Sequence, residues 1–253
     1  MTPKDRIIVA LDVPTMEQAQ ALAEELGSHV GGFKIGLELS TAMLALIIGP
    51  PSEEEAIANF KKIRRFFSTI DHGQVFWDGK MNDIPNTIAG AARAVAGLNF
   101  KMFNLHASAG IEGMMAAVAN KGKSLVLAVT ILTSFEENNA NLVFGGPTKA
   151  KVLQFARDAK SAECDGIVCS PQELILLSKQ RELNGLLKVT PGIRSKNSPP
   201  DDQKRTMAAG EAIMAGADYL VIGRPITSAS HRVVAANEFA AEIAGALKLR
   251  TAA

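Results

Sequence analysis

Short apolar segments rich in β-branched residues recur along the whole chain, and each enters a polar or glycine-rich turn. Longer segments with helical periodicity and many Ala, Glu and Lys residues separate them, so the pattern predicts alternating strands and helices. The predicted strands cover residues 6–12, 31–37, 74–80, 100–107, 124–133, 166–170, 187–194 and 219–226. Predicted helices include residues 15–27, 86–98, 149–162 and 229–248.

This alternation predicts an α/β fold with a parallel sheet, because parallel strands buried on both faces are apolar throughout. Eight strand–helix units close into a (β/α)₈ TIM barrel more readily than they fill an open sheet. A doubly wound sheet is the second possibility, but its dinucleotide-binding form needs a glycine-rich turn after the first strand, where this chain has "LDVPTM". No linker interrupts residues 1–253, so we expect a single catalytic domain.

The connection between the second and third predicted strands, residues 38–73, is unusually long. Within it, "GPPSEEE" indicates a turn followed by Ser52 as a helix N-cap, with acidic residues in the first turn. The amphipathic segment 56–67 follows. We therefore expect an elongated connection with an extra helix or turn, and no separate domain.

Composition narrows the possible partners. The chain is 47% hydrophobic with a net charge of +1, and it has no basic block and no apolar run long enough to span a membrane. We therefore expect neither nucleic acid nor a membrane as a partner. Cys164 and Cys169 lack the spacing of a metal site and are too few for a disulfide framework. The N-terminus lacks the features of a signal peptide, so the cytoplasm is the expected location.

Polar residues stand at the ends of most predicted strands. Active sites of this barrel form where the strands end, on the loops that lead into the helices. One charged residue at a strand end is ordinarily just the first solvated residue, but so many polar residues at strand ends together indicate a site. The polar residues at the strand ends are Asp12, Lys34, Asp78, Lys80, His106, Thr133, Ser170, Arg194 and Arg224.

The segment "DGKMNDIPNT" concentrates charge most strongly. Asp78 and Lys80 are two residues apart on one strand, so their side chains point to the same side. Lys34 points to the barrel interior if it alternates with its apolar neighbours. With Asp83, these residues form a Lys–Asp–Lys–Asp array of alternating charge. Burying such an array costs several kcal/mol per ion unless the pairing is good, which indicates a functional role.

Arg194 and Arg224 end the seventh and eighth predicted strands, each beside glycines. The loops at these positions commonly bind phosphate in this barrel, and the guanidinium fork suits phosphate oxygens. Residues 195–205 are polar and interrupted by prolines, which favours a mobile lid, and Gln203 could donate its amide to the same phosphate. The alternative is two surface arginines on ordinary turns.

With these residues in place, the chain resembles the orotidine 5′-monophosphate decarboxylase family. "DGKMNDIPNT" matches the family's D-x-K-x-x-D-I-P-N-T signature, and the resemblance runs from "IIVALDVP" through "FKIGLEL", "LTS" and "TPGIR" to "DYLVIGRPIT". It implies a cofactor-independent and metal-free loss of CO₂ from C6 of orotidine 5′-monophosphate, giving uridine 5′-monophosphate. It also implies a homodimer.

The resemblance also implies the role of each site residue. Lys34, Asp78, Lys80 and Asp83 would be the catalytic array, with Lys80 as the proton donor to C6. Asp83 and Thr87 would serve the partner subunit's site. His106 lies in a segment that matches the family, "NLHASAG", but we assign it no catalytic role and expect a hydrogen-bonded structural histidine. The substrate-binding residues would be Asp12, Lys34, Asp78, Asp83, Ile84, Thr87, Thr133, Arg194, Gln203, Gly223 and Arg224.

Two features depart from the family pattern: the long 38–73 connection, and Asn82 where many members have histidine. Neither touches the charged array. Three alternatives stay open at this stage. They are an Mg²⁺-dependent sugar-phosphate decarboxylase or synthase of the same barrel type, a Schiff-base aldolase using Lys80, and a nucleotide-binding barrel without activity. Carboxylates beside Lys80 keep its amine protonated, which argues against the aldolase.

Overall fold

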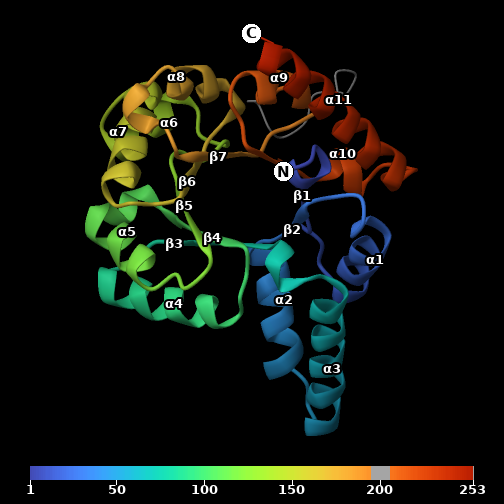
Figure 1. Cartoon of the computed structure of the whole chain (residues 1–253). Coiled ribbons are helices and arrows are strands. Elements are labelled where there is room, and N and C mark those ends of the chain that lie inside the picture. Colours follow the sequence, from blue (N-terminus) through green and yellow to red (C-terminus); the bar gives the residue numbers. More distant parts are fainter. Residues whose placement is uncertain (195–205, 253) are drawn as a thin grey trace.

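Eight parallel strands close into a barrel in which each strand pairs with its neighbours in chain order and β1 pairs with β8 (Figure 1). The computed structural model describes residues 1–194 and 206–252. The strands are β1 (Ile7–Ala10), β2 (Gly32–Ile35), β3 (Val75–Met81), β4 (Met102–His106), β5 (Leu125–Val129), β6 (Gly166–Val168), β7 (Leu187–Thr190) and β8 (Tyr219–Ile222). The predicted (β/α)₈ barrel is confirmed, and the open doubly wound sheet is wrong.

Helices surround the barrel (Figure 1). They are α1 (Met16–Leu26), α2 (Leu37–Ile48), α3 (Glu53–Thr69), α4 (Pro85–Gly97), α5 (Gly110–Ala119), α6 (Glu137–Phe144), α7 (Thr148–Ser161), α8 (Leu174–Ser178), α9 (Ala209–Met214), α10 (Arg224–Thr227) and α11 (Arg232–Ala252). Within the described ranges, no helix combines the length and apolar character needed to cross a bilayer.

The strands separate two hydrophobic layers because successive side chains point to opposite faces. The larger layer packs the outer faces of the strands against the helices and includes Phe33 and Ile35. The smaller layer fills the barrel interior. It consists of Ile8, Ala10, Phe76, Met102, Leu127, Val189, Tyr219 and Val221. Lys34, between Phe33 and Ile35, therefore points into the barrel, as its alternation predicted.

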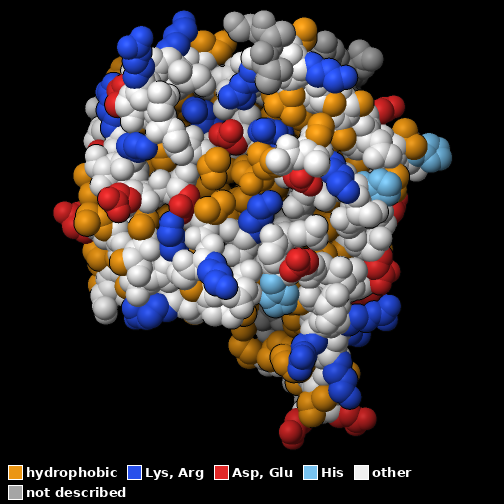
Figure 2. All heavy atoms as spheres, viewed as in Figure 1, with side chains coloured by type: hydrophobic (Ala, Val, Ile, Leu, Met, Phe, Trp, Pro, Cys, Tyr) orange, Lys and Arg blue, Asp and Glu red, His pale blue; other side chains and the backbone are white. Residues whose placement is uncertain are grey.

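The long second connection folds into a helical hairpin of α2 and α3 that projects from the barrel (Figure 1). The Ser52 hydroxyl caps α3 by accepting a hydrogen bond from the Glu55 backbone N–H, as predicted. Asn59 of α3 donates its side-chain amide to the Leu46 carbonyl of α2 over 3.0 Å, which ties the two helices together. Apolar side chains of this hairpin remain exposed, and acidic residues cover its tip (Figure 2).

Candidate active site at the barrel mouth

A cavity of about 490 Å³ opens at the carboxyl ends of the strands. In Figure 2 it is a hollow with an apolar floor, and charged side chains surround it. Val129, Val168 and Val221, together with Phe76, contribute apolar surface to it. Its charged lining consists of Asp12, Lys34, Asp78, Lys80, Arg194 and Arg224. Six charged residues that the sequence places near the ends of five strands are thus brought together around one cavity.

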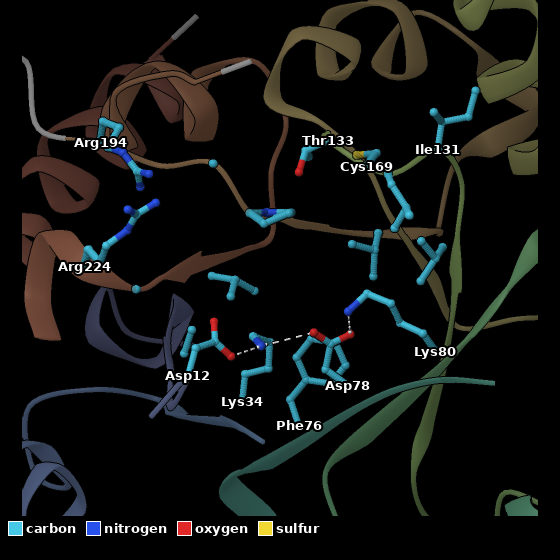
Figure 3. A pocket seen from close by; sticks show the side chains of 18 of the residues that line it. Asp12, Lys34, Phe76, Asp78, Lys80, Ile131, Thr133, Cys169, Arg194 and Arg224 are labelled. Carbon is cyan, nitrogen blue, oxygen red and sulfur yellow. Dashed lines mark hydrogen bonds and ion pairs between the residues drawn. The ribbon is translucent and has the colours of Figure 1, made fainter. Parts of the chain in front are cut away.

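Four of these residues form a continuous row of alternating charge (Figure 3). The Lys34 ammonium lies 2.8 Å from a carboxylate oxygen of Asp12 and 3.1 Å from Asp78 Oδ2. The Lys80 ammonium lies 2.8 Å from Asp78 Oδ1. Gly36 lies beside this row, and a Cβ atom at this position would stand 2.9 Å from Lys34 Nζ and 3.2 Å from Asp12 Oδ1, so any other residue would displace the ion pair.

Burial and charge act in opposite directions on the two most buried members of the row. Burial alone would raise the pKa of Asp78, but the charges of Lys34 and Lys80 and the hydrogen bonds to the carboxylate lower it below its ordinary value. Burial alone would lower the pKa of Lys34, but Asp78 and Asp12 raise it above its ordinary value. Both groups therefore stay charged at neutral pH, although each is more than nine-tenths buried.

Lys80 reaches this position through an irregular backbone. Its φ is +47°, a left-handed conformation that is uncommon for a residue with a side chain, and the pairing of β3 with β4 shifts register between Trp77 and Met81. Gly79 is required before it, since a Cβ atom would lie 2.4 Å from the Trp77 ring. The prediction that Asp78 and Lys80 share a side is confirmed. The regular strand geometry behind that prediction is wrong at Lys80.

Asn104 of β4 is a part of the site that the sequence analysis missed. It is fully buried, its side-chain amide donates to Asp78 Oδ1 over 2.6 Å, and its side-chain oxygen accepts from the Lys80 backbone N–H over 2.7 Å. The available signal was an asparagine within the apolar run "FKMFNLHA", because a buried amide needs partners for both of its ends.

Three other residues from the sequence analysis lie near the mouth without joining the row. His106 ends β4, and burial together with the charge of Lys80 lowers the pKa of its ring. The hydrogen bond expected for this ring is not found within the described ranges. Ser170 is fully buried and caps the short helix Pro171–Glu173, so it is structural. Cys169 lines the cavity, but burial raises the pKa of its thiol and leaves it a poor nucleophile.

Asp83, Ile84 and Thr87 lie at the start of α4, outside the cavity of their own chain. All three are exposed, and the Asp83 carboxylate accepts a hydrogen bond from the Ile84 backbone N–H. The Ile84 side chain is 65% exposed, which is unusual for a large apolar residue at a helix N-cap. A single chain therefore brings three members of the predicted array together and leaves the fourth apart.

Arg194 and Arg224 line one end of the cavity, at the opposite side from Lys80 (Figure 3). Gly192 and Gly223 lie beside them, and Gly192 has a φ of +81° that glycine adopts easily. Thr133 lines the cavity from the loop after β5. The predicted lid, residues 195–205 with Gln203, lies outside the described residues. Among those described, no cluster of three or more His, Cys, Asp or Glu side chains has metal-binding geometry.

Comparison with known proteins points to one family. The model of the orotidine 5′-phosphate decarboxylase / HUMPS family matches residues 5–239. The chain is 40% identical to the orotidine 5′-phosphate decarboxylase of Moorella thermoacetica, over 96% of this chain and 94% of that protein. It is 42% identical to the one of Geotalea daltonii, over 94% and 95%.

A solved structure supports the same relationship. The crystal structure of orotidine 5′-phosphate decarboxylase from Lactobacillus acidophilus superposes with a TM-score of 0.73 at 29% identity, covering 94% of this chain and 98% of that one. The similarity thus extends over nearly the whole barrel.

The ion pairs of Asp78 predict how stability depends on pH. Because the folded-state pKa of Asp78 is lowered, its contribution to stability is present above the unfolded pKa and is lost as pH falls through the folded value. We expect Asp78→Asn to lower the free energy of unfolding by about 3 kcal/mol at pH 7. Between about pH 5 and pH 2 the variant should lose less stability than the wild type. Denaturant unfolding at a series of pH values measures the free energy of unfolding of both proteins. If that free energy fell with pH in parallel for the two proteins, the lowered pKa of Asp78 would be contradicted.

Proposed function

The chain belongs to the orotidine 5′-phosphate decarboxylase / HUMPS family, and from this premise we propose that it decarboxylates orotidine 5′-monophosphate to uridine 5′-monophosphate. This reaction is the last step of de novo uridine 5′-monophosphate synthesis. The observation that carries the proposal is the row of Lys34, Asp78 and Lys80, of which the first two are buried, at the mouth of a barrel whose relatives carry this activity. A cytoplasmic location stays a prediction from the sequence.

The reaction is difficult because loss of CO₂ leaves negative charge on an sp² ring carbon with no adjacent electron sink. In our proposal the Lys80 ammonium lies beside C6, where this charge develops. A fixed positive charge beside C6 in a poorly solvated site stabilises the carbanion that develops there more than it stabilises the substrate, whose negative charge is on its carboxylate. Lys80 then delivers its proton to C6, and no cofactor takes part in the step.

The other members of the row keep Lys80 in place and act on the leaving group. The Asp78 carboxylate, held between two ammonium groups, lies next to the substrate carboxylate in this arrangement and raises its free energy. Release of CO₂ relieves that repulsion. Lys34 balances the charge of Asp78, and Asp12 is assigned to the nucleotide ribose.

Phosphate recognition is assigned to the far end of the cavity. Arg194 and Arg224, with the backbone at Gly223, would hold the phosphate, and Gln203 would complete its binding. Thr133 would contact the pyrimidine. Since the arginines lie across the cavity from Lys80, phosphate binding energy would act on the reaction only indirectly.

We further propose that the active unit is a homodimer in which each chain completes its partner's site. Asp83, Ile84 and Thr87 would reach the partner's cavity from the start of α4. The exposure of the Ile84 side chain and the distance of Asp83 from its own cavity both support this arrangement. Asp83 would then place the fourth charge of the array beside the Lys80 ammonium of the other chain.

The proposed activity has a direct test. We expect purified protein to consume orotidine 5′-monophosphate, measured as loss of its ultraviolet absorbance, and to do so at an unchanged rate after dialysis against EDTA. Turnover that stops in EDTA and returns with Mg²⁺ would instead favour a metal-dependent sugar-phosphate enzyme of the same barrel type.

Replacing Lys80 separates chemistry from binding. We expect Lys80→Ala to lower kcat by at least about 10⁴-fold while uridine 5′-monophosphate binds with similar affinity, because only the transition state needs the ammonium at C6. Arg224→Ala should mainly weaken nucleotide binding. Lys121→Ala is the matched control, since Lys121 is also a partly buried lysine in an ion pair, with Asp165, outside the cavity. Near-normal turnover of Lys80→Ala would remove Lys80 as the proton donor.

The shared site predicts complementation between two inactive variants. Lys80→Ala and Asp83→Ala should each be nearly inactive alone. In a mixed dimer, one site combines an intact Lys80 with an intact Asp83 from the other chain, and the second site has neither. Co-expression should therefore restore about a quarter of wild-type activity, because half of the dimers are mixed and each has one working site. Absence of any recovery in confirmed mixed dimers would mean that Asp83 serves its own chain.

A further inference from the structure

Asn104 lies fully buried in β4, in a stretch where the chain is otherwise apolar from Met102 to Leu105. Its two side-chain ends make different hydrogen bonds. One end faces the Lys80 backbone N–H, which can only donate, and the other faces the Asp78 carboxylate, which can only accept. The oxygen must therefore face Lys80 and the amide nitrogen must face Asp78, so the chemistry of the partners fixes the orientation of the amide.

The hydrogen bond to Asp78 adds a donor without adding a charge. Asp78 Oδ2 faces the Lys34 ammonium, whereas Oδ1 receives both the Lys80 ammonium at 2.8 Å and the Asn104 amide at 2.6 Å. A carboxylate whose two oxygens face donors from three directions cannot rotate without losing one of them. Asn104 thus fixes the plane of the carboxylate that contacts the Lys80 ammonium.

The hydrogen bond from Lys80 acts on the backbone. A left-handed φ is unfavourable for lysine, and it persists only where the surrounding structure compensates for it. The shift in β3–β4 pairing between Trp77 and Met81 removes regular ladder partners from this segment. The Asn104 side-chain oxygen replaces the missing acceptor for the Lys80 N–H.

We propose that Asn104 is a positioning residue for the decarboxylation, because it clamps the Lys80 backbone and the Asp78 carboxylate to each other and so sets where the Lys80 ammonium lies. This inference rests on the proposed function. The same side chain holds both ends of the Lys80–Asp78 ion pair, one through the main chain and one through the carboxylate. A residue that merely filled the barrel would need neither contact.

The first test compares Asn104→Ala with Ser124→Ala. Ser124 is an equally buried polar residue whose hydroxyl donates to the Phe100 carbonyl over 2.7 Å, outside the cavity. We expect Asn104→Ala to lower kcat by about 10²-fold, because a small displacement of a reacting group has an effect of this size. The affinity for uridine 5′-monophosphate should change by less than about threefold. Ser124→Ala should lower the thermal stability and leave kcat unchanged.

The second test uses Asn104→Asp, which keeps the shape of the side chain. The new carboxyl still accepts from the Lys80 N–H, but it can donate to Asp78 only when protonated. Burial and the charge of Asp78 raise the pKa of such a group. We therefore expect kcat of this variant to approach the wild-type value at low pH and to fall as pH rises. The wild type and Ser124→Ala should not show this fall of kcat.

Three outcomes would overturn the proposal. One is an Asn104→Ala protein with unchanged kcat, and another is an Asn104→Asp protein whose pH profile parallels the wild type. The third is joint loss of turnover and of uridine 5′-monophosphate binding in both variants, which would make Asn104 a residue of the fold alone. Failure of the proposed function itself is distinct, because the wild-type protein would then not consume orotidine 5′-monophosphate.

Discussion

The carboxylate of Asp78 is the interaction on which the site depends. It is buried in the middle of β3, and it pairs with the ammonium groups of Lys34 and Lys80. Removing three charges from water is costly, and only close pairing with additional hydrogen bonds offsets that cost. The lowered pKa of Asp78 and the raised pKa of Lys34 indicate that the pairing succeeds. A rigid charge array then exists before any substrate binds, which is what electrostatic stabilisation of a transition state requires.

Several otherwise unrelated residues follow from this requirement. Gly36 leaves room for the Asp12–Lys34 pair. Gly79, which stands between Asp78 and Lys80 in β3, leaves room for the Trp77 ring. Asn104 provides a neutral donor to the same carboxylate. Within a strand, Gly79 and Asn104 are unfavourable choices, because glycine weakens a strand and a buried amide needs partners for both of its ends. Their local costs are consistent with a site whose geometry matters more than local stability.

The sequence predicted the barrel and the cavity well because both follow from periodicity. Strands buried on both faces are apolar, and the residues that end them meet at one mouth, so Asp12, Lys34 and Arg224 could be grouped without coordinates. The left-handed backbone of Lys80 could not be predicted, since a two-residue spacing suggests a regular strand whichever conformation the chain adopts. Asn104 was missed because its importance lies in contacts with another strand. The apolar α2 has weak periodicity, so only α3 of the hairpin could be recognised.

Charge balance in the cavity gives a reason for the separation of its two ends. The lining contains four cations (Lys34, Lys80, Arg194 and Arg224) and two carboxylates (Asp12 and Asp78), a net charge of +2. A nucleotide phosphate carries about −2 at neutral pH, so bound phosphate alone neutralises the lining. In the proposed reaction the substrate carboxylate adds a further negative charge that no cation of the lining is left to balance, and the partner's Asp83 would increase that excess. Loss of CO₂ moves this charge to C6, beside Lys80. Transfer of the Lys80 proton neutralises C6, and the negative excess is relieved once the Lys80 amine takes up a proton from solvent. The site therefore favours the neutral product ring over the charged substrate ring, while the phosphate at the far end keeps both bound.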